Sequence, residues 1–357
     1  MKIAICLPSY NEAKNIQNST KIVDSGLTKY FPNQECYIVN ADNTSPDGTN
    51  ELFNKVQTNA KKISILETNP GKGYNLINFF EFCQKNQIDF AATIDSDVVS
   101  INQEWIQKLI SPLIRGEADY LTPIYKRHRY EGSTTNHFVF PGVFAVCNQF
   151  IRQPIAGDFA FNKKFVDMIL AQEINEEIKH YGIDIFMTLN ACFNNLKVGQ
   201  VLLGNKFHSP SFNKMEGMFK QVLRAYIFTL QKNIDKIKNH KNILNNIPVF
   251  EESISTVKTF KHKQFAIDKY AESKQFLAEK GIKISKSNIG KIWVKYFAQF
   301  INHIKNNTLD CEFIEIFEHL FFARATAFWL HAEYISAKSA EDEIIQQSKN
   351  IFKEVNV

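Results

Sequence analysis

The stretch Phe90-Ala91-Ala92-Thr93-Ile94-Asp95-Ser96-Asp97 decides the fold class of this 357-residue chain. Its first five residues are typical of a buried strand, and the polar triplet that follows marks the end of that strand. Two carboxylates next to a buried strand are costly to desolvate unless a positive group satisfies them. A divalent cation bound to a diphosphate is one such group. The alternative is a helix N-cap, formed by Asp97 or Ser100.

The same strand-then-polar pattern recurs on both sides of this stretch. Short apolar runs alternate with segments of helical spacing, which predicts an α/β domain with a Rossmann-like, mainly parallel sheet and helices on both faces. The predicted strands are 2–7, 37–39, 63–66, 90–94 and 120–122, and the predicted helices are 12–29, 49–60, 73–85 and 102–115. Ligands bind at the carboxyl ends of strands in such sheets. We therefore expect segments 8–12, 40–49, 69–73 and 95–97 to converge on one edge.

Three of these converging loops carry candidate binding residues. Pro8-Ser9-Tyr10-Asn11-Glu12 is either a proline turn leading into a helix cap or a loop that holds a nucleobase against Tyr10. The segment 42–49 is either a turn and cap or a source of acid and amide groups for a base or ribose. Gly71-Lys72-Gly73 is a surface turn by default, although a lysine between two glycines can approach a phosphate.

The pattern changes beyond residue 212. Helical spacing dominates from there, over 214–238, 254–280, 288–306, 311–335 and 339–353. This predicts a catalytic domain over 1–212 and a helical domain over 213–357. The abundance of phenylalanine, 31 residues, predicts phenylalanine-rich packing.

Charge divides the chain in nearly the same place. Residues 1–212 are close to neutral at −1, residues 213–305 hold 18 lysines and arginines against 7 acids, and residues 306–357 hold 4 against 9. The basic segment is a solvated helix face by default, or a surface for an anionic acceptor or an acidic membrane. The acidic tail is expected to pair with it, within one chain or between chains. No recognised nucleic-acid module accompanies the charge, so nucleic acid is not an expected partner.

The cysteines and the hydropathy bear on the compartment. None of the six cysteines forms a C-x-x-C pair, which favours free thiols over disulfides or a zinc site. No run approaches the length of a membrane span, and the first apolar run is too short for a secretory signal. We therefore expect a cytoplasmic protein.

The motifs taken in order are more specific than any one of them. Strand-P-S-Y-N-E, then D-N-T-S-P-D-G-T, then G-K-G, then strand-D-S-D resembles the GT-A glycosyltransferases over residues 1–100. The resemblance implies a nucleotide-sugar donor whose diphosphate is held by Mg²⁺ or Mn²⁺. By motif position, the residues that contact the nucleotide would be Pro8, Tyr10, Glu12, Asn43, Lys72, Asp95 and Ser96.

The middle of the chain narrows this resemblance. Segments 153–158 (Gln-Pro-Ile-Ala-Gly-Asp), 181–184 (Tyr-Gly-Ile-Asp) and 204–208 (Gly-Asn-Lys-Phe-His) are similar to stretches of mannosylglycerate synthase and glucosyl-3-phosphoglycerate synthase. The resemblance to these retaining enzymes extends over about 1–235. It implies Asp97 and His208 as the protein ligands of the metal.

The same resemblance assigns catalytic roles. Lys206 would add positive charge at the diphosphate, Asp184 would bind hydroxyls of the sugar or position the acceptor, and Asp158 would line the sugar pocket. Taken alone, His208 is more often a structural histidine and Asp184 an ordinary helix cap. A retaining enzyme of this kind needs no strong general base, since the leaving phosphate oxygen can accept the proton of the acceptor.

The sequence departs from these relatives at the expected acceptor loop. No arginine lies within 131–136, where the relatives place one suited to a carboxylate or phosphate. The basic run just upstream consists of Lys126, Arg127, His128 and Arg129. It is either a substitute for that arginine or a solvated face, which is the more common role of a basic run. At position 158 an aspartate also stands in place of a glutamate.

The prediction is thus a metal-dependent retaining α-glycosyltransferase. It would move a hexose from GDP-mannose or UDP-glucose to a small, polar, anionic acceptor such as a glycerate, and it is expected to form a homo-oligomer. One alternative is an inverting family-2-like enzyme with Asp184 or Asp158 as base. A nucleotidyltransferase would need a glycine-rich basic loop after the first strand, which Pro8–Glu12 is not. The last alternative is a non-catalytic binding protein on the same fold.

Overall fold

The computed structural model describes residues 1–207, 215–240, 242–243 and 262–356. These residues pack into two compact units. The first consists of residues 1–125 and 155–229, and the second of residues 126–154 and 230–357. Each unit is therefore built from two separate stretches of chain, and each is considered by itself below.

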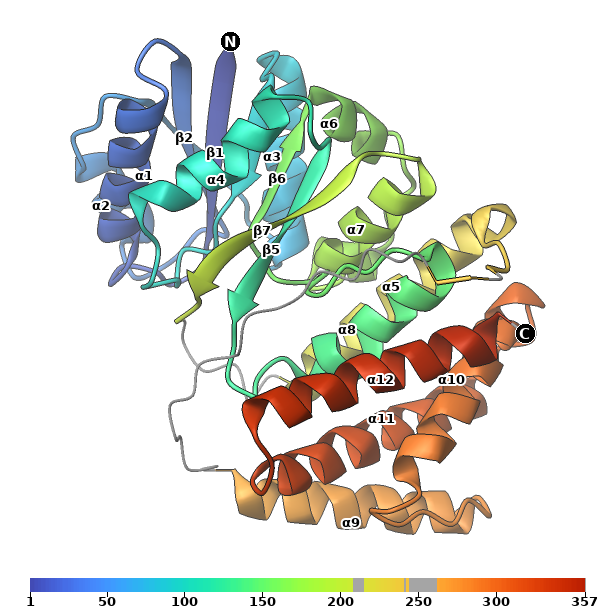
Figure 1. Cartoon of the computed structure of the whole chain (residues 1–357). Helices are drawn as coiled ribbons and strands as arrows, with labels where there is room; N and C mark the ends of the chain where they lie inside the picture. The colour runs from blue at the N-terminus through green and yellow to red at the C-terminus, as the bar shows by residue number, and fades with distance from the viewer. Residues whose placement is uncertain (208–214, 241, 244–261, 357) are drawn as a thin grey trace. The chain divides into compact units, whose positions relative to one another are not determined.

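A seven-stranded sheet forms the centre of the first unit (Figure 1). Its strand order is β3-β2-β1-β4-β6-β5-β7. The strands are β1 (Lys2–Ser9), β2 (Glu35–Asp42), β3 (Lys61–Leu66), β4 (Phe90–Thr93), β5 (Tyr120–Lys126), β6 (Phe159–Asn162) and β7 (Val198–Asn205). β1 pairs in parallel with β2 and with β4, β2 pairs in parallel with β3, and β6 runs antiparallel to both β4 and β5.

The register of the parallel strands sets the position of the loops. Ser9 pairs with Asp42, Asp42 pairs with Leu66, and Cys6 pairs with Thr93. The carboxyl ends of the four parallel strands therefore meet at one edge of the sheet, and the loops that follow them start side by side. This confirms the expected convergence of these segments.

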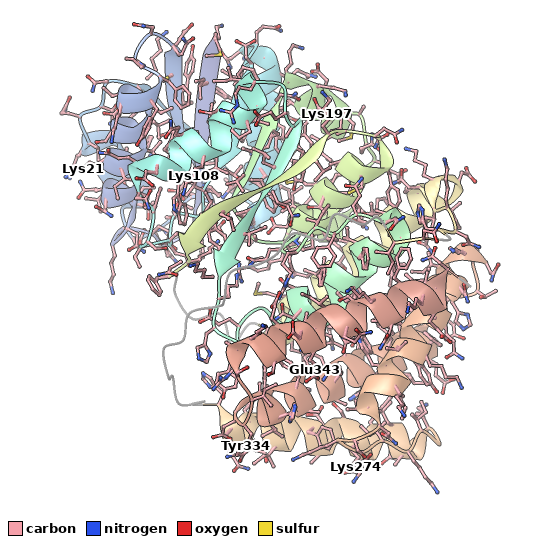
Figure 2. The ribbon with its side chains drawn as sticks, in the orientation of Figure 1. Lys21, Lys108, Lys197, Lys274, Tyr334 and Glu343 are labelled. Carbon is pink, nitrogen blue, oxygen red and sulfur yellow. The ribbon has the colours of Figure 1, made fainter. Side chains whose placement is uncertain are left out.

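Helices cover both faces of the sheet. One layer holds α1 (Ile16–Tyr30), α2 (Thr49–Lys55) and α4 (Gln103–Ile114), and the other holds α3 (Lys72–Lys85), α6 (Lys163–Leu170) and α7 (Ile183–Phe193). The outer faces of the first layer are polar, as Lys21 on α1 and Lys108 on α4 show (Figure 2). The inner faces pack on buried strand residues such as Ile5 and Ile38. The predicted mainly parallel sheet is confirmed.

The prediction missed β6 and β7. β6 is only four residues long, which is too short to be recognised as a strand, and β7 mixes buried and exposed residues. α8 (Met215–Lys232) begins close to the predicted 214, although its residues up to Thr229 belong to the first unit.

The second unit is helical. It contains α5 (Phe140–Cys147), preceded by the π-helical turn η1 (Thr135–Val139), and then α9 (Lys263–Glu279), α10 (Ile289–Lys305), α11 (Cys311–Ala332) and α12 (Ala337–Val355). Aromatic rings fill its core. Phe300 stacks on Phe317 with 4.1 Å between the ring centroids, and the ring centroid of Trp293 lies 4.7 Å from that of Phe317. The expectations of a helical C-terminal region and of phenylalanine-rich packing are confirmed. Part of the predicted helix 254–280 lies outside the described residues.

The chain divides into units at different places from the predicted boundary at residue 212. Segment 126–154 joins the helical unit because α5 is almost entirely apolar and is buried there. Within that unit the basic segment does pair with the acidic tail, through Lys263–Glu333 and Lys280–Glu312. Among the described residues, no helix combines the length and the apolar character that a membrane span requires.

Candidate active site

The polar triplet at the end of β4 is tied to the end of β1. Ser96 is buried, and its hydroxyl donates to the carbonyl oxygen of Pro8 at 2.8 Å. The carbonyl oxygen of Ser96 in turn accepts a hydrogen bond from the hydroxyl of Ser19 on α1. Pro8 and Ser96, both predicted to contact the nucleotide, are therefore hydrogen-bonded to each other. This bond fixes the turn that carries Asp95 and Asp97.

The first loop is held by the side chains of the second. The backbone N–H groups of Asn11, Glu12 and Ala13 donate to Ser45 Oγ, Thr49 Oγ1 and Asp47 Oδ2, at 2.9, 2.9 and 3.0 Å. Tyr10 stays outside this network and its side chain is 53% exposed. An exposed ring on a rigid loop is available for stacking on a nucleobase, as predicted for Tyr10.

Asn43 is used inside the protein. Its amide nitrogen donates to the carbonyl oxygen of Asn69 at 2.8 Å, and its amide oxygen accepts from Asn75 Nδ2 at 2.9 Å. The neighbouring Thr44 has a φ of 51°, which is unfavourable for a β-branched residue, and its hydroxyl donates to the carbonyl oxygen of Glu67. The structure thus places Asn43 at the predicted edge, with its side chain joining the second loop to the third.

Negative charge accumulates where the metal is predicted. Burial raises the pKa of Glu12, and the nearby carboxylates of Asp97, Asp47 and Asp95 raise it further. A divalent cation would relieve this repulsion. Asp97 is half-buried and supplies a hard oxygen ligand, which suits Mg²⁺ or Mn²⁺ that keeps phosphate and water as its other ligands. His208, the second predicted ligand, lies outside the described residues.

The two glycines around Lys72 serve backbone packing. A Cβ on Gly71 would lie 2.4 Å from the carbonyl oxygen of Lys179, and one on Gly73 would lie 2.0 Å from that of Ile178. Gly71 also has a φ of 157°. The start of α3 therefore packs directly on the 3₁₀ turn η2 (Glu176–Lys179). This close approach fixes where the side chain of Lys72 begins.

From that position Lys72 reaches two carboxylates. Its ammonium lies 2.9 Å from Asp95 Oδ1 and 3.2 Å from Asp184 Oδ1, and 3.4 Å from the carbonyl oxygen of Gly157. Burial alone would lower the pKa of Lys72, but Asp184 and Asp95 outweigh it and raise the pKa above its usual range. Lys72 is therefore a fixed cation at the carboxyl edge of the sheet.

Asp95 lies between two lysines. Its second oxygen accepts from the ammonium of Lys206 at 3.1 Å. Burial would raise the pKa of Asp95, but Lys72 and Lys206 outweigh this and lower it well below the usual range. Asp95 therefore remains ionised.

Asp158 has no exposed surface, and both its oxygens are occupied. Oδ1 accepts from the backbone N–H of Asp95 at 2.7 Å, and Oδ2 accepts from Lys206 at 2.6 Å and from the hydroxyl of Tyr125 at 2.5 Å. Lys206 also donates to the carbonyl oxygen of Ala156 at 2.7 Å. The three predicted catalytic residues thus lie in one cluster with Lys72 and Asp95, and of the three, Asp158 lies deepest.

Asp184 sits in the first turn of α7 and is almost fully buried. Burial raises its pKa, which Lys72 partly counteracts. It is one of three carboxylates, with Asp95 and Asp158, that surround two ammonium groups. The cluster is therefore acidic overall and close to the acidic group formed by Glu12 and Asp97.

Two residues of the cluster had no recognisable signal in the sequence. Tyr125 is the penultimate residue of β5 and has the pattern of an ordinary strand residue, but its hydroxyl donates to Asp158 Oδ2. Gly157 has a φ of 93°, and a Cβ there would lie 2.0 Å from Asp95 Oδ2. The segment 153–158 contains this glycine, but the steric need for it arises from Asp95, 62 positions earlier in the chain.

Comparisons with known proteins agree with this geometry. Residues 4–169 match the model of the family "Glycosyl transferase family 2". A search of curated proteins found no match.

Solved structures of glucosyl-3-phosphoglycerate synthase from Mycobacterium tuberculosis are similar in fold. The complex with Mn²⁺, uridine diphosphate and glucosyl-3-phosphoglycerate has a TM-score of 0.53 at 20% identity, over 64% of this chain and 79% of that chain. The complex with phosphoglyceric acid has a TM-score of 0.52 at 21% identity, over the same shares. The complex with Mg²⁺ and uridine diphosphate has a TM-score of 0.51 at 20% identity, also over 64% and 79%.

The parallel half-sheet, the loops at its carboxyl edge and the match over 4–169 lead to one assignment. Residues 4–169 are similar to glycosyl transferase family 2, and the sheet is similar in fold to a GT-A enzyme, which confirms both the predicted resemblance and the prediction of a glycosyltransferase.

Proposed function

We propose that this enzyme is a metal-dependent retaining α-glycosyltransferase that moves a hexose from a nucleotide diphosphate sugar to a small anionic acceptor. The observation that carries the proposal is the cluster of Lys72, Asp95, Asp184 and Lys206 at the carboxyl edge of the sheet. A fixed cation among carboxylates, at the same sheet edge as the loop with the exposed Tyr10 ring, suits a ligand that combines a base, a diphosphate and a polyhydroxylated sugar.

The residues divide the work by their chemistry. Tyr10 offers its ring to the base, and Lys72 offers positive charge to the leaving diphosphate. Asp184, which pairs with Lys72, would accept hydrogen bonds from sugar hydroxyls or orient the acceptor. Asp97, together with His208 as predicted from the sequence, would hold Mg²⁺ or Mn²⁺. When bound, that ion supplies Lewis-acid stabilisation of the diphosphate.

The similar structures support a UDP-linked donor and a phosphorylated or carboxylated acceptor. Their complexes contain UDP-glucose with phosphoglyceric acid, and UDP-glucose with glycerol 3-phosphate. For this chain UDP-glucose is therefore the first donor to test and GDP-mannose the second. The predicted cytoplasmic location and homo-oligomeric state remain predictions, as does membrane contact through the basic segment.

The test is a donor panel of UDP-glucose, UDP-N-acetylglucosamine and GDP-mannose, with and without Mn²⁺. Donor hydrolysis and transfer to glycerate or 3-phosphoglycerate are followed by mass spectrometry. We expect turnover of one donor that is lost on metal chelation. If none of the donors shows metal-dependent turnover or binding, the proposal is refuted.

For the inverting alternative, only one of the two proposed bases, Asp184, has a suitable environment. An inverting enzyme needs a carboxylate base, and the raised pKa of Asp184 would suit that role. Asp158 does not suit it, because both its oxygens are occupied. The anomeric configuration of the glycoside product, read by NMR, separates the α-retaining outcome from the inverted one.

A further inference from the structure

Asp158 is connected to the Asp95-Ser96-Asp97 turn by two routes, one direct and one through Lys206. Its Oδ1 accepts the backbone N–H of Asp95, its Oδ2 accepts from the ammonium of Lys206, and that ammonium also donates to Asp95 Oδ2. The carboxylate therefore fixes the first aspartate of the turn both at its backbone and, through Lys206, at its side chain. Asp158 itself has no exposed surface with which to contact a substrate.

Tyr125 completes this arrangement from a different strand. Its hydroxyl donates to Asp158 Oδ2 at 2.5 Å, and its ring lies 5.2 Å from the ammonium of Lys206. A carboxylate that accepts three hydrogen bonds, two of them on one oxygen, has a single allowed orientation. Such a group is suited to holding its neighbours in place and unsuited to accepting a proton from a substrate.

Gly157 makes the close approach possible. With a φ of 93°, it turns the chain just before Asp158, and any Cβ would collide with Asp95 Oδ2. Its carbonyl oxygen accepts a hydrogen bond from Thr93 Oγ1 at the end of β4 and lies 3.4 Å from the ammonium of Lys72. The hydrogen bond between Thr93 and Gly157 thus joins the end of β4 to the segment just before β6, at the point where the acidic turn begins.

From these contacts we infer that Asp158 is a positioning residue, held by Tyr125, that sets the orientation of Asp95 and Lys206 for donor binding. It is neither a general base nor a ligand of the transferred sugar. This inference rests on the proposed function, because its readout is the affinity for the nucleotide and metal. It assigns Asp158 a different role from the sugar-pocket residue that the resemblance implies.

The first experiment uses the full chain and a variant that removes one hydrogen bond and no charge. Tyr125→Phe is compared with Tyr120→Phe, which lies on the same strand β5 and loses an equally buried hydrogen bond, to Thr188 Oγ1 at 3.0 Å. Binding of UDP with Mn²⁺, and of GDP with Mn²⁺, is measured by calorimetry, and the melting temperature is measured without ligand.

The two tyrosine variants should lose similar thermal stability but differ in binding. We expect Tyr125→Phe to weaken nucleotide binding by about three- to tenfold, the range for one buried hydrogen bond. Tyr120→Phe should bind as tightly as the wild type. Equal affinity in both variants would overturn the inference, since Tyr125 would then be merely structural.

The second experiment separates positioning from base catalysis. Asp158→Asn keeps an oxygen for the N–H of Asp95 but turns a donor toward Lys206 and Tyr125. We expect it to raise KM for the donor at least tenfold, with a smaller change in kcat and an unchanged shape of the pH profile. A fall in kcat of a hundredfold or more at unchanged KM, the signature of a lost general base, would refute the inference.

Measurements on the wild type separate a failure of the proposed function from a failure of the positioning role alone. If it binds neither nucleotide in the presence of Mn²⁺ and turns over no donor, the proposed function fails and the positioning role fails with it. If it binds a nucleotide while Tyr125→Phe and Asp158→Asn both bind it equally well, only the positioning role fails. Should Asp158→Asn fold poorly, the Tyr125→Phe and Tyr120→Phe comparison decides alone.

Discussion

Both units of this protein bury charged side chains, but they balance them differently. In the first unit three carboxylates, of Asp95, Asp158 and Asp184, surround the ammonium groups of Lys72 and Lys206. In the second unit Arg152 meets Glu341 in a bidentate pair at 2.7 and 2.8 Å, one charge against one.

The difference in charge balance indicates which of the two clusters binds a ligand. A balanced, bidentate pair is complete in itself and serves the packing of the helices. An acidic cluster next to further carboxylates at a sheet edge is electrostatically incomplete, and a cation can complete it.

Replacing Asp97 by alanine should abolish transfer without unfolding the protein. The half-buried carboxylate is the predicted metal ligand among the described residues, and loss of a Lewis acid worth several kcal/mol lowers kcat/KM about a thousandfold. Donor turnover and the Mn²⁺ concentration at half-maximal rate are the measurements. Asp167→Asn, at a carboxylate paired with Lys163 on α6, is the control and should keep full activity. An active Asp97→Ala enzyme would refute the role of this carboxylate.

Breaking the balanced pair in the second unit should cost stability. Arg152→Met leaves Glu341 without its partner, and we expect a loss of about 3 kcal/mol, the lower end for a buried pair because Glu341 is partly exposed. Urea denaturation measures it.

The double variant tests whether this pair is complete in itself. Arg152→Met combined with Glu341→Leu removes both charges and should return to within about 1 kcal/mol of the wild type. If the double variant is as unstable as the single one, the arginine contributes through its packing on Phe140 and the ion pair is not the cause.

Gly73→Ala should disturb the first cluster through the backbone. The new Cβ would lie 2.0 Å from the carbonyl oxygen of Ile178, so α3 must shift and carry Lys72 with it. Overpacking of this kind costs about 1–3 kcal/mol, and donor affinity should fall in parallel. Gly217→Ala, on α8 with open space around the glycine, is the matched control. It should be neutral or slightly stabilising, and a comparable loss there would show that the collision is not the cause.

The sequence predicted the half of the fold that carries continuous apolar runs. β1 to β4 and the helices between them follow directly from local patterns, and so does the edge at which Asp95 and Lys72 meet. β6 was missed because four residues beginning with Phe159 carry no period of their own. Its existence depends on pairing with β4, which lies more than 60 residues earlier.

The hydrogen-bond partners within the site could not be predicted either, because they too are far apart in the sequence. Tyr125 lies on β5, Asp158 just before β6 and Lys206 just after β7, and no local spacing links the three. The resemblance implied by motif position that Asn43 faces the nucleoside, while in the structure its amide group bonds to Asn69 and Asn75. Motif position therefore locates a residue at the site, while the geometry decides what its side chain does there.

The smallest expected effect concerns a neutral group in the second unit. His137 is fully buried, and among the described residues neither of its ring nitrogens has a hydrogen-bond partner. Burial lowers its pKa well below the usual value, and the positive charges of Arg324 and Arg152 lower it further. The folded protein therefore keeps His137 neutral, while the unfolded chain binds a proton at about pH 6.5.

Stability should consequently fall as the pH drops below about 6.5, because only the unfolded state gains the proton. The contribution of one histidine is at most about 1.4 kcal/mol per pH unit, so a loss of about 1 kcal/mol is expected between pH 6.5 and 5.5. His137→Phe should flatten this slope in urea denaturation, whereas His331→Gln, at a more exposed ring, should keep it. If both variants retain the wild-type slope, His137 titrates in the folded protein and the second unit does not require its neutrality.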